Sequence, residues 1–235
     1  MRMRKKKHGE ERLAACAHLL KERMETPITS SLADFGRETP MALEIGCGKG
    51  GFACGMAQKH PDICFYAMEK IPNVMVAALE KAVATEAERE NDNLRFIIAN
   101  ADDLEAWFAP ASLDVIYLNF SDPWPKERHA KRRLTHRSYL LKYFRLLKQG
   151  GKICFKTDNV GLFDFSLSEL EALGLSPLFV TRDLHHSPYM EGNVMTEYEK
   201  NFSEKGFSIH KWELACPPAS LWEGYGTAER KENEK

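Results

Sequence analysis

Short apolar runs alternate with stretches of helical periodicity along most of this 235-residue chain, and no other feature limits its fold more. Runs of β-branched, aromatic and aliphatic residues are typical of buried strands. Strands separated by helices imply right-handed crossovers and a mostly parallel sheet covered on both faces. We therefore expect an α/β fold. Its seven strands are predicted over residues 41–45, 64–68, 94–98, 115–118, 152–155, 178–181 and 209–214.

Helices are expected around these strands. They are predicted over residues 10–24, from a glycine-rich turn to about Lys59, over 72–90, and over 134–147. Pro72 marks the start of the third helix, because proline is favoured in the first helical turn. Gly150-Gly151 is expected to stop the fourth, because glycine commonly ends helices.

Composition favours one domain of ordinary α/β size. Apolar residues make up 43% of the chain, enough for a large core. We expect a basic N-terminal arm at 1–9, a single domain at 10–228 and a polar tail at 229–235. No apolar run reaches transmembrane length, and the charged start has no apolar segment behind it, so we expect a cytoplasmic protein without a membrane partner. A monomer and a homodimer are equally compatible with the sequence.

The six cysteines include no Cys-x-x-Cys pair and lie mainly in apolar surroundings. We expect them to be core residues, without a disulfide framework or a zinc site. His185-His186 is a weak metal candidate, because adjacent side chains point in different directions. We predict no metal.

A glycine-rich turn follows the first strand. Glu44-Ile45-Gly46-Cys47-Gly48 has G-x-G-x-G spacing after an acidic residue, whereas dinucleotide sites use G-x-G-x-x-G. Glycine lets the backbone approach a ligand closely. The combination is more typical of S-adenosylmethionine binding, although close helix–strand packing is the alternative.

The next two strand ends support the same cofactor. Glu69 ends the second strand, where a carboxylate can accept hydrogen bonds from ribose hydroxyls. Asn100 follows the third strand and can meet the adenine edge. We therefore predict a cofactor site at the carboxyl ends of these strands.

Residues 119–126, Asn-Phe-Ser-Asp-Pro-Trp-Pro-Lys, follow the fourth strand directly. Ligands bind at the carboxyl ends of strands in open α/β sheets. Two prolines stiffen the backbone, so Asp122, Trp124 and Lys126 should be held on a rigid loop. A tight turn with a surface tryptophan is the alternative.

A strongly basic stretch comes next in a chain whose net charge is only -1. It contains Lys126, Arg128, Lys131, Arg132 and Arg133, and only Glu127 opposes them. A solvated helix face is the alternative, but the position beside Asp122 favours phosphates of a nucleic acid.

Two later segments also face the predicted site. Asp158 follows the fifth strand. Thr196-Glu197-Tyr198-Glu199 starts a short helix, and a purely structural capping box between Thr196 and Glu199 is an open alternative to substrate binding.

Together these motifs closely resemble the bacterial tRNA (guanine-N7-)-methyltransferases, class I enzymes that use S-adenosylmethionine. The resemblance covers nearly the whole chain. The Asp-Pro-Trp-x-Lys loop and the following Arg-His-x-Lys-Arg-Arg stretch are specific to that family, whereas most class I methyltransferases share the glycine turn. Ser121 stands where many relatives have proline, and Asn100 where some have aspartate.

The resemblance implies a Rossmann-like fold and methyl transfer to N7 of guanine 46 in the variable loop of tRNA. It implies a catalytic role for Asp122. The cofactor residues would be Glu44, Gly46, Gly48, Glu69, Asn100 and Asp122. The substrate residues would be Lys126, Arg128, Lys131, Arg132, Arg133, Asp158, Thr196, Glu197, Tyr198 and Glu199.

Two other functions remain possible from the residues. A methyltransferase for small molecules or proteins would explain the glycine turn and Glu69 but not the basic stretch. A non-catalytic RNA-binding protein with a Rossmann-like core would explain the basic stretch alone.

Overall fold

The computed structural model describes residues 8–222, so the predicted basic arm falls largely outside the described residues and the polar tail wholly outside. The strands are β1 (Met41–Ile45), β2 (Cys64–Glu69), β3 (Leu94–Ile98), β4 (Leu113–Asn119), β5 (Leu147–Thr157), β6 (Phe179–Thr181) and β7 (His210–Ala215). The helices are α1 (Gly9–Ala15), α2 (Leu32–Phe35), α3 (Gly51–Lys59), α4 (Pro72–Ala84), α5 (Leu104–Trp107), α6 (Arg137–Leu146), α7 (Val160–Ala172) and α8 (Glu197–Ser203).

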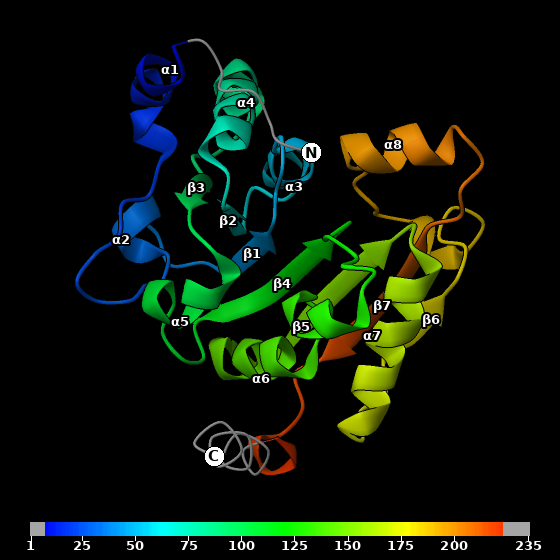
Figure 1. The fold of residues 1–235 in the computed structure, drawn as a ribbon. Coiled ribbons are helices and arrows are strands. Elements are labelled where there is room, and N and C mark those ends of the chain that lie inside the picture. The colour runs from blue at the N-terminus through cyan, green and yellow to red at the C-terminus, as the bar shows by residue number, and fades with distance from the viewer. Residues whose placement is uncertain (1–7, 223–235) are drawn as a thin grey trace.

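The strands form one sheet in the order β3-β2-β1-β4-β5-β7-β6 (Figure 1). Strands β1 to β5 pair in parallel, and β7 runs antiparallel to both β5 and β6. The predicted α/β fold with a seven-stranded, mostly parallel sheet is confirmed. Because the chain moves outward from β1 to β3 and then returns to β4 beside β1, the strand order reverses at β1 and β4. Ligand crevices in α/β sheets form at such a point.

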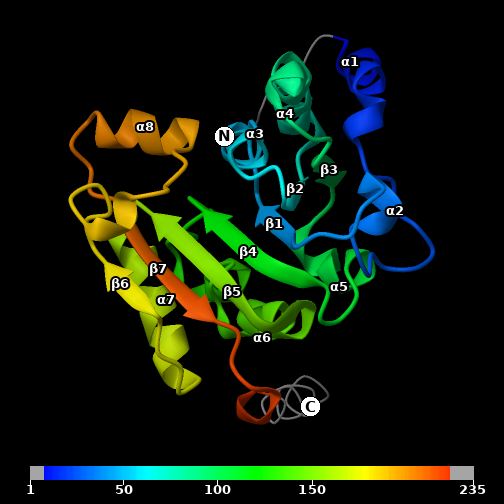
Figure 2. The ribbon, with the colours of Figure 1, turned by 180° about the vertical axis from the view of Figure 1, so that it is seen from behind.

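Helices pack on both faces of the sheet. Leu140 of α6 and Phe163 of α7 belong to one buried core, and Phe52 of α3 and Leu79 of α4 belong to the other. Figures 1 and 2 show α6 and α7 on one side of β4, β5 and β7. In the described part of the chain, no helix combines the length and apolar character needed to cross a membrane.

The first helix is shorter than the predicted 10–24. It ends at Ala15, and a short 3-10 turn follows. Leu20 then pairs with Phe96 of β3, and the Lys21 N–H donates to the Phe96 carbonyl at 2.8 Å. Pairing along the edge strand therefore replaces the last turns of the expected helix.

The third predicted helix, 72–90, ends at Ala84. The Thr85 hydroxyl donates to the Lys81 carbonyl at 3.1 Å. Threonine side chains that bond to nearby backbone compete with helix continuation.

Gly150-Gly151 lies inside β5 and does not end a helix, because α6 already stops at Leu146. The pairing of β4 with β5 shifts register between Leu113 and Val115, opposite these glycines. Glycine within a strand often marks a bulge or a close backbone approach, and here it allows both strands to stay in contact.

The sequence prediction missed α7. Its start is marked by Asn159, whose side chain accepts a hydrogen bond from the Leu162 N–H at 2.8 Å. Leu162, Phe163, Ser166 and Leu170 then face the interior at helical spacing.

Replacing Gly151 with alanine should destabilise the fold by about 1–3 kcal/mol, because overpacking forces the backbone to shift. An alanine Cβ there would lie 2.9 Å from the Asp114 carbonyl and 3.0 Å from the Lys148 carbonyl. Gly161→Ala is the matched control, since its nearest atom is the Asn159 Oδ1 at 3.5 Å. Urea unfolding at equilibrium measures both, and equal stabilities would contradict the packing argument.

Candidate active site

A cavity of about 630 Å³ opens at the carboxyl ends of β1, β2 and β4. Its walls include Gly46, Glu69, Asn100 and Asp122 from the predicted cofactor set, together with Lys131 and Arg132 from the basic stretch. A second cavity of about 310 Å³ shares Gly46 with the first. The walls of the second include Glu44, Gly48, Thr196, Glu197 and Tyr198.

The backbone of the glycine turn is directly exposed to these cavities. Gly46 and Gly48 have φ values of 79° and 57°, a left-handed conformation that favours glycine. A Cβ at either position would meet no atom within 4 Å. The turn therefore leaves room for a ligand to approach the backbone.

Glu69 is held by the backbone around it. Its carboxylate accepts hydrogen bonds from the Gly48 N–H at 3.2 Å and the Ile71 N–H at 2.9 Å. A carboxylate has about four acceptor positions, so each oxygen keeps capacity for a further donor.

Glu44 is buried at the end of β1. One carboxylate oxygen accepts a hydrogen bond from the Asn119 amide at 2.9 Å, and the other has no hydrogen-bond partner within residues 8–222. Burial raises the pKa of Glu44 to about 7, against the lowering effects of the Asn119 hydrogen bond and the Lys156 charge. Glu44 is part of the wall of the second cavity, and a donor or cation that reached this buried oxygen from there would satisfy it.

The loop after β4 carries two bulky residues in the left-handed region, Phe120 at φ 51° and Trp124 at φ 42°. Such conformations cost free energy and persist only when the surroundings enforce them. Asp122 lies between them with its side chain 71% exposed, and its carboxylate is 3.9 Å from the Lys70 ammonium. The loop therefore presents Asp122 to the cavity with capacity for further donors.

Arg133 holds this loop in place. Its guanidinium donates to the carbonyls of Pro123 at 3.1 Å and Trp124 at 3.0 Å. It also lies 4.2 Å from the centre of the Phe165 ring. With these contacts in place Arg133 supports the loop, and its role as a substrate residue stays a prediction.

The other cations of the basic stretch are exposed. Lys126, Arg128 and Lys131 face solvent, and the Arg132 guanidinium lies 5.1 Å from the Trp124 ring centre. Lys131 and Arg132 line the larger cavity, whereas Lys126 and Arg128 lie outside its walls.

Thr196 and Glu199 form a capping box at the start of α8. The Thr196 hydroxyl accepts from the Glu199 N–H at 2.8 Å. The Glu199 side chain is 0% exposed and is bonded to Lys156, His185 and Asn193. Glu199 lines neither cavity, and its substrate role stays a prediction.

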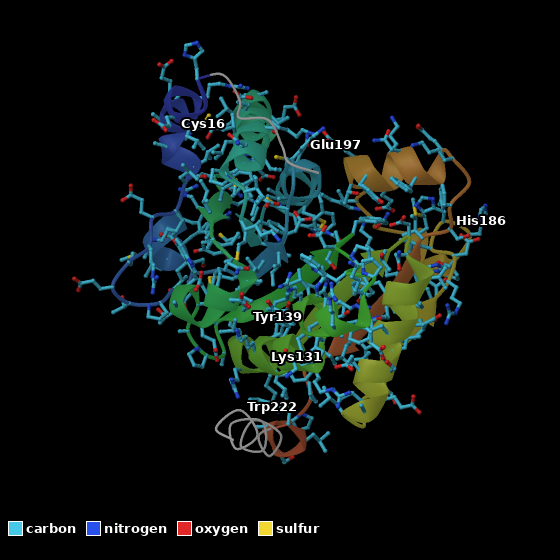
Figure 3. The ribbon with its side chains drawn as sticks, in the orientation of Figure 1. Cys16, Lys131, Tyr139, His186, Glu197 and Trp222 are labelled. Carbon is cyan, nitrogen blue, oxygen red and sulfur yellow. The ribbon has the colours of Figure 1, made fainter. Side chains whose placement is uncertain are left out.

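Glu197 and Tyr198 are exposed at the start of α8. Figure 3 shows Glu197 on the side of α3 and α8, whereas Tyr139 lies on α6 and Lys131 lies near that helix. Glu197 forms an ion pair with Lys81. The Tyr198 hydroxyl lies 3.4 Å from the Asp158 carboxylate, so Asp158 faces this segment.

Sequence reasoning missed Tyr139, which lines the larger cavity from α6. Its hydroxyl donates to Asp102, and the Asn100 amide donates to the other Asp102 oxygen at 2.8 Å. No local motif marks Tyr139, because it reaches the site from a distant helix.

No group of three or more potential metal ligands occurs within the described part of the chain. His185 and His186 contact different carboxylates, Glu199 and Asp183.

Several solved structures are similar to this chain. An antibiotic-related methyltransferase matches with a TM-score of 0.57 at 16% identity, covering 83% of this chain and 98% of its own. The 16S rRNA methyltransferase KamB matches with a TM-score of 0.60 at 12% identity, covering 83% and 100%. A geranyl diphosphate methyltransferase in complex with GPP and sinefungin matches with a TM-score of 0.51 at 16% identity, covering 88% and 78%.

At these identities the likeness shows the fold, and the predicted Rossmann-like class I methyltransferase fold is confirmed. A family with the description "Putative methyltransferase" matches residues 38–212, which is most of the chain. This chain therefore belongs to the methyltransferase family that contains the tRNA (guanine-N7-)-methyltransferases.

Proposed function

We propose that this methyltransferase transfers a methyl group from S-adenosylmethionine to N7 of guanine 46 in the variable loop of tRNA. One observation carries the proposal. The 630 Å³ cavity joins the strand-end residues Glu69 and Asn100 to Asp122 and to the cations Lys131 and Arg132. The strand-end residues suit a small molecule and the cations suit phosphates, and Asp122 lies in the cavity that both sets line.

The strand-end residues fit the cofactor. The free Glu44 oxygen can accept from an ammonium group, and the open space above Gly46 and Gly48 admits a ligand. Bound S-adenosylmethionine would supply an electrophilic methyl group on a sulfonium. The proposed contacts are Glu44, Gly46, Gly48, Glu69, Asn100 and Asp122.

The chemistry at guanine N7 needs positioning more than proton transfer. N7 carries an in-plane lone pair and loses no proton when it is methylated. Orienting two reactants can supply about 7–11 kcal/mol of barrier lowering. Asp122 would orient the guanine and offset the positive charge that develops on it.

The exposed cations would bind the RNA backbone through phosphates. Trp124, with Arg132 over its ring, offers a surface on which an unstacked base can lie. The proposed RNA contacts are Lys126, Arg128, Lys131, Arg132, Asp158, Thr196, Glu197 and Tyr198. Residues 10–228 are proposed to act as one domain.

The direct test of the substrate class is transfer of a tritiated methyl group to unmodified tRNA. We expect incorporation into tRNA but not into small acceptors or proteins. Incorporation into small acceptors alone would favour a small-molecule methyltransferase. Binding of tRNA without cofactor binding and without transfer to any acceptor would favour a non-catalytic RNA-binding protein.

Cofactor affinity should rise with pH through the Glu44 pKa. Because that pKa is about 7, the carboxylate becomes ionised over about pH 6 to 8, and its attraction for a cofactor ammonium grows over that range. The slope should approach about tenfold per pH unit at the acid end. Calorimetric titration of wild type and Glu44→Gln checks this, and a pH-dependent affinity that persists in the variant would contradict it.

The raised pKa of Glu44 also predicts that the stability of the cofactor-free protein falls as pH rises, whereas cofactor affinity rises. A raised folded-state pKa contributes stability at low pH, and this contribution is lost as pH rises through about 7. Without cofactor, Glu44→Gln should therefore melt at a higher temperature than wild type at pH 8.

Removing exposed cations should weaken the salt dependence of tRNA binding. The double variant Arg128→Gln/Lys131→Gln should flatten the slope of log affinity against log salt by about 0.7–0.9 per lost phosphate contact. Arg133→Gln is the control, because that guanidinium already holds two carbonyls. An unchanged slope in the double variant would indicate that Arg128 and Lys131 belong to a solvated surface and contact no phosphate.

Asp122→Asn should lower the single-turnover methylation rate about 10²-fold at saturating cofactor and tRNA, as expected for losing one preorganised electrostatic group. The fold and tRNA affinity should change little, because Asp122 is exposed. The wild-type rate should stay nearly flat over about pH 6–7. A wild-type rate that climbs log-linearly there, and loses the climb in the variant, would indicate proton removal by Asp122.

A further inference from the structure

Lys156 is the next-to-last residue of β5. Its side chain is 4% exposed, and its ammonium is bonded entirely to one segment. It donates to the Asn193 side-chain oxygen at 3.0 Å, the Val194 carbonyl at 2.9 Å and the Glu199 carboxylate at 2.6 Å. An ammonium has three donors, so all three are used. This segment, residues 193–199, carries Thr196, Glu197 and Tyr198.

The acceptor side of the cluster is equally complete. The Glu199 carboxylate also accepts from the Asn193 amide at 2.8 Å and from the Thr196 N–H at 3.4 Å, and His185 lies 3.0 Å away. Lys156 and Glu199 thus fix the start of α8 from the inside of the molecule.

Lys156 also contacts the opposite wall of the site. Its carbonyl accepts a hydrogen bond from the Phe120 N–H at 2.9 Å, and its ammonium lies 6.0 Å from the Phe120 ring centre. Phe120 comes two residues before Asp122 and lines both cavities. A single buried residue therefore joins the Asp122 loop to the segment that carries Thr196–Tyr198.

A contribution to folding stability alone does not account for the buried ion pair between Lys156 and Glu199. Removing two charges from water costs about as much as their attraction returns, so apolar replacements of such pairs are often neutral or stabilising. The three hydrogen bonds of the Lys156 ammonium have defined directions, so they hold residues 193–199 at a fixed distance from the Asp122 loop. Apolar packing has no such directionality.

We propose that Lys156 is a positioning residue that sets the separation between the Asp122 loop and residues 193–199, and so aligns the acceptor base with the methyl donor. The kinetic part of this proposal rests on the proposed function. The structural part does not.

The test compares Lys156→Met, Lys156→Met/Glu199→Gln and the control Lys21→Met. Lys21 forms an ion pair with Asp34, with side chains 13% and 7% exposed, away from both cavities. The double variant leaves no unpaired charge in the cluster, so its thermal stability should return toward wild type. Hydrogen exchange of residues 193–199 and single-turnover methylation of tRNA are the readouts.

In both Lys156 variants we expect amide exchange in residues 193–199 to quicken by about tenfold or more, as local opening requires. The single-turnover rate should fall about 10-fold to 10²-fold while tRNA affinity changes little, as expected for misplaced reactants. Lys21→Met should keep wild-type exchange and rate. A merely structural role would lower the amount of active enzyme but not its rate.

Recovery of both exchange and rate in the double variant would overturn the proposal, because Lys156 would then contribute stability alone. A wild-type enzyme that methylates no tRNA would overturn the proposed function. The exchange measurement needs no substrate and still decides the role of Lys156.

Discussion

The parallel pairing of β1 with β4 is the constraint on which the site depends. Ile45 lies opposite Leu118 in this pairing, so the glycine turn and the Asp122 loop leave the sheet side by side. The hydrogen bond from Asn119 to Glu44 at 2.9 Å ties the two strand ends together. Because the strand order reverses here, no crossover helix fills the space between these ends.

Around that crevice, charged groups that are bonded within the protein hold the walls, and exposed charges are left for ligands. Arg133 fixes the Asp122 loop through two carbonyls, and Glu199 fixes the start of α8 through Lys156. Asp122 and Lys131 remain accessible at the cavity. This division suits a reaction limited by alignment, since rigid supports reduce the reorganisation needed at the moment of transfer.

The strand ends could be predicted from the sequence because short apolar runs followed by polar residues are a local signal. The contacts that a charged side chain makes with distant parts of the chain are not a local signal, so the sequence could not show that Arg133 bonds to the Asp122 loop or that Glu199 bonds to Lys156. The same limit explains Gly150-Gly151, whose role in β5 depends on the approach of β4. Tyr139 carries no motif, because it reaches the cavity only through the packing of α6.

The proposed function is methylation of one guanine, at N7, within tRNA. Its most direct test maps the methylated nucleotide on an unmodified tRNA transcript by chemical cleavage at 7-methylguanosine, beside a transcript with adenine at position 46. We predict cleavage at guanine 46 in the first transcript and no methyl incorporation in the second. Equal incorporation into both transcripts, or modification at another atom or nucleotide, would contradict the account.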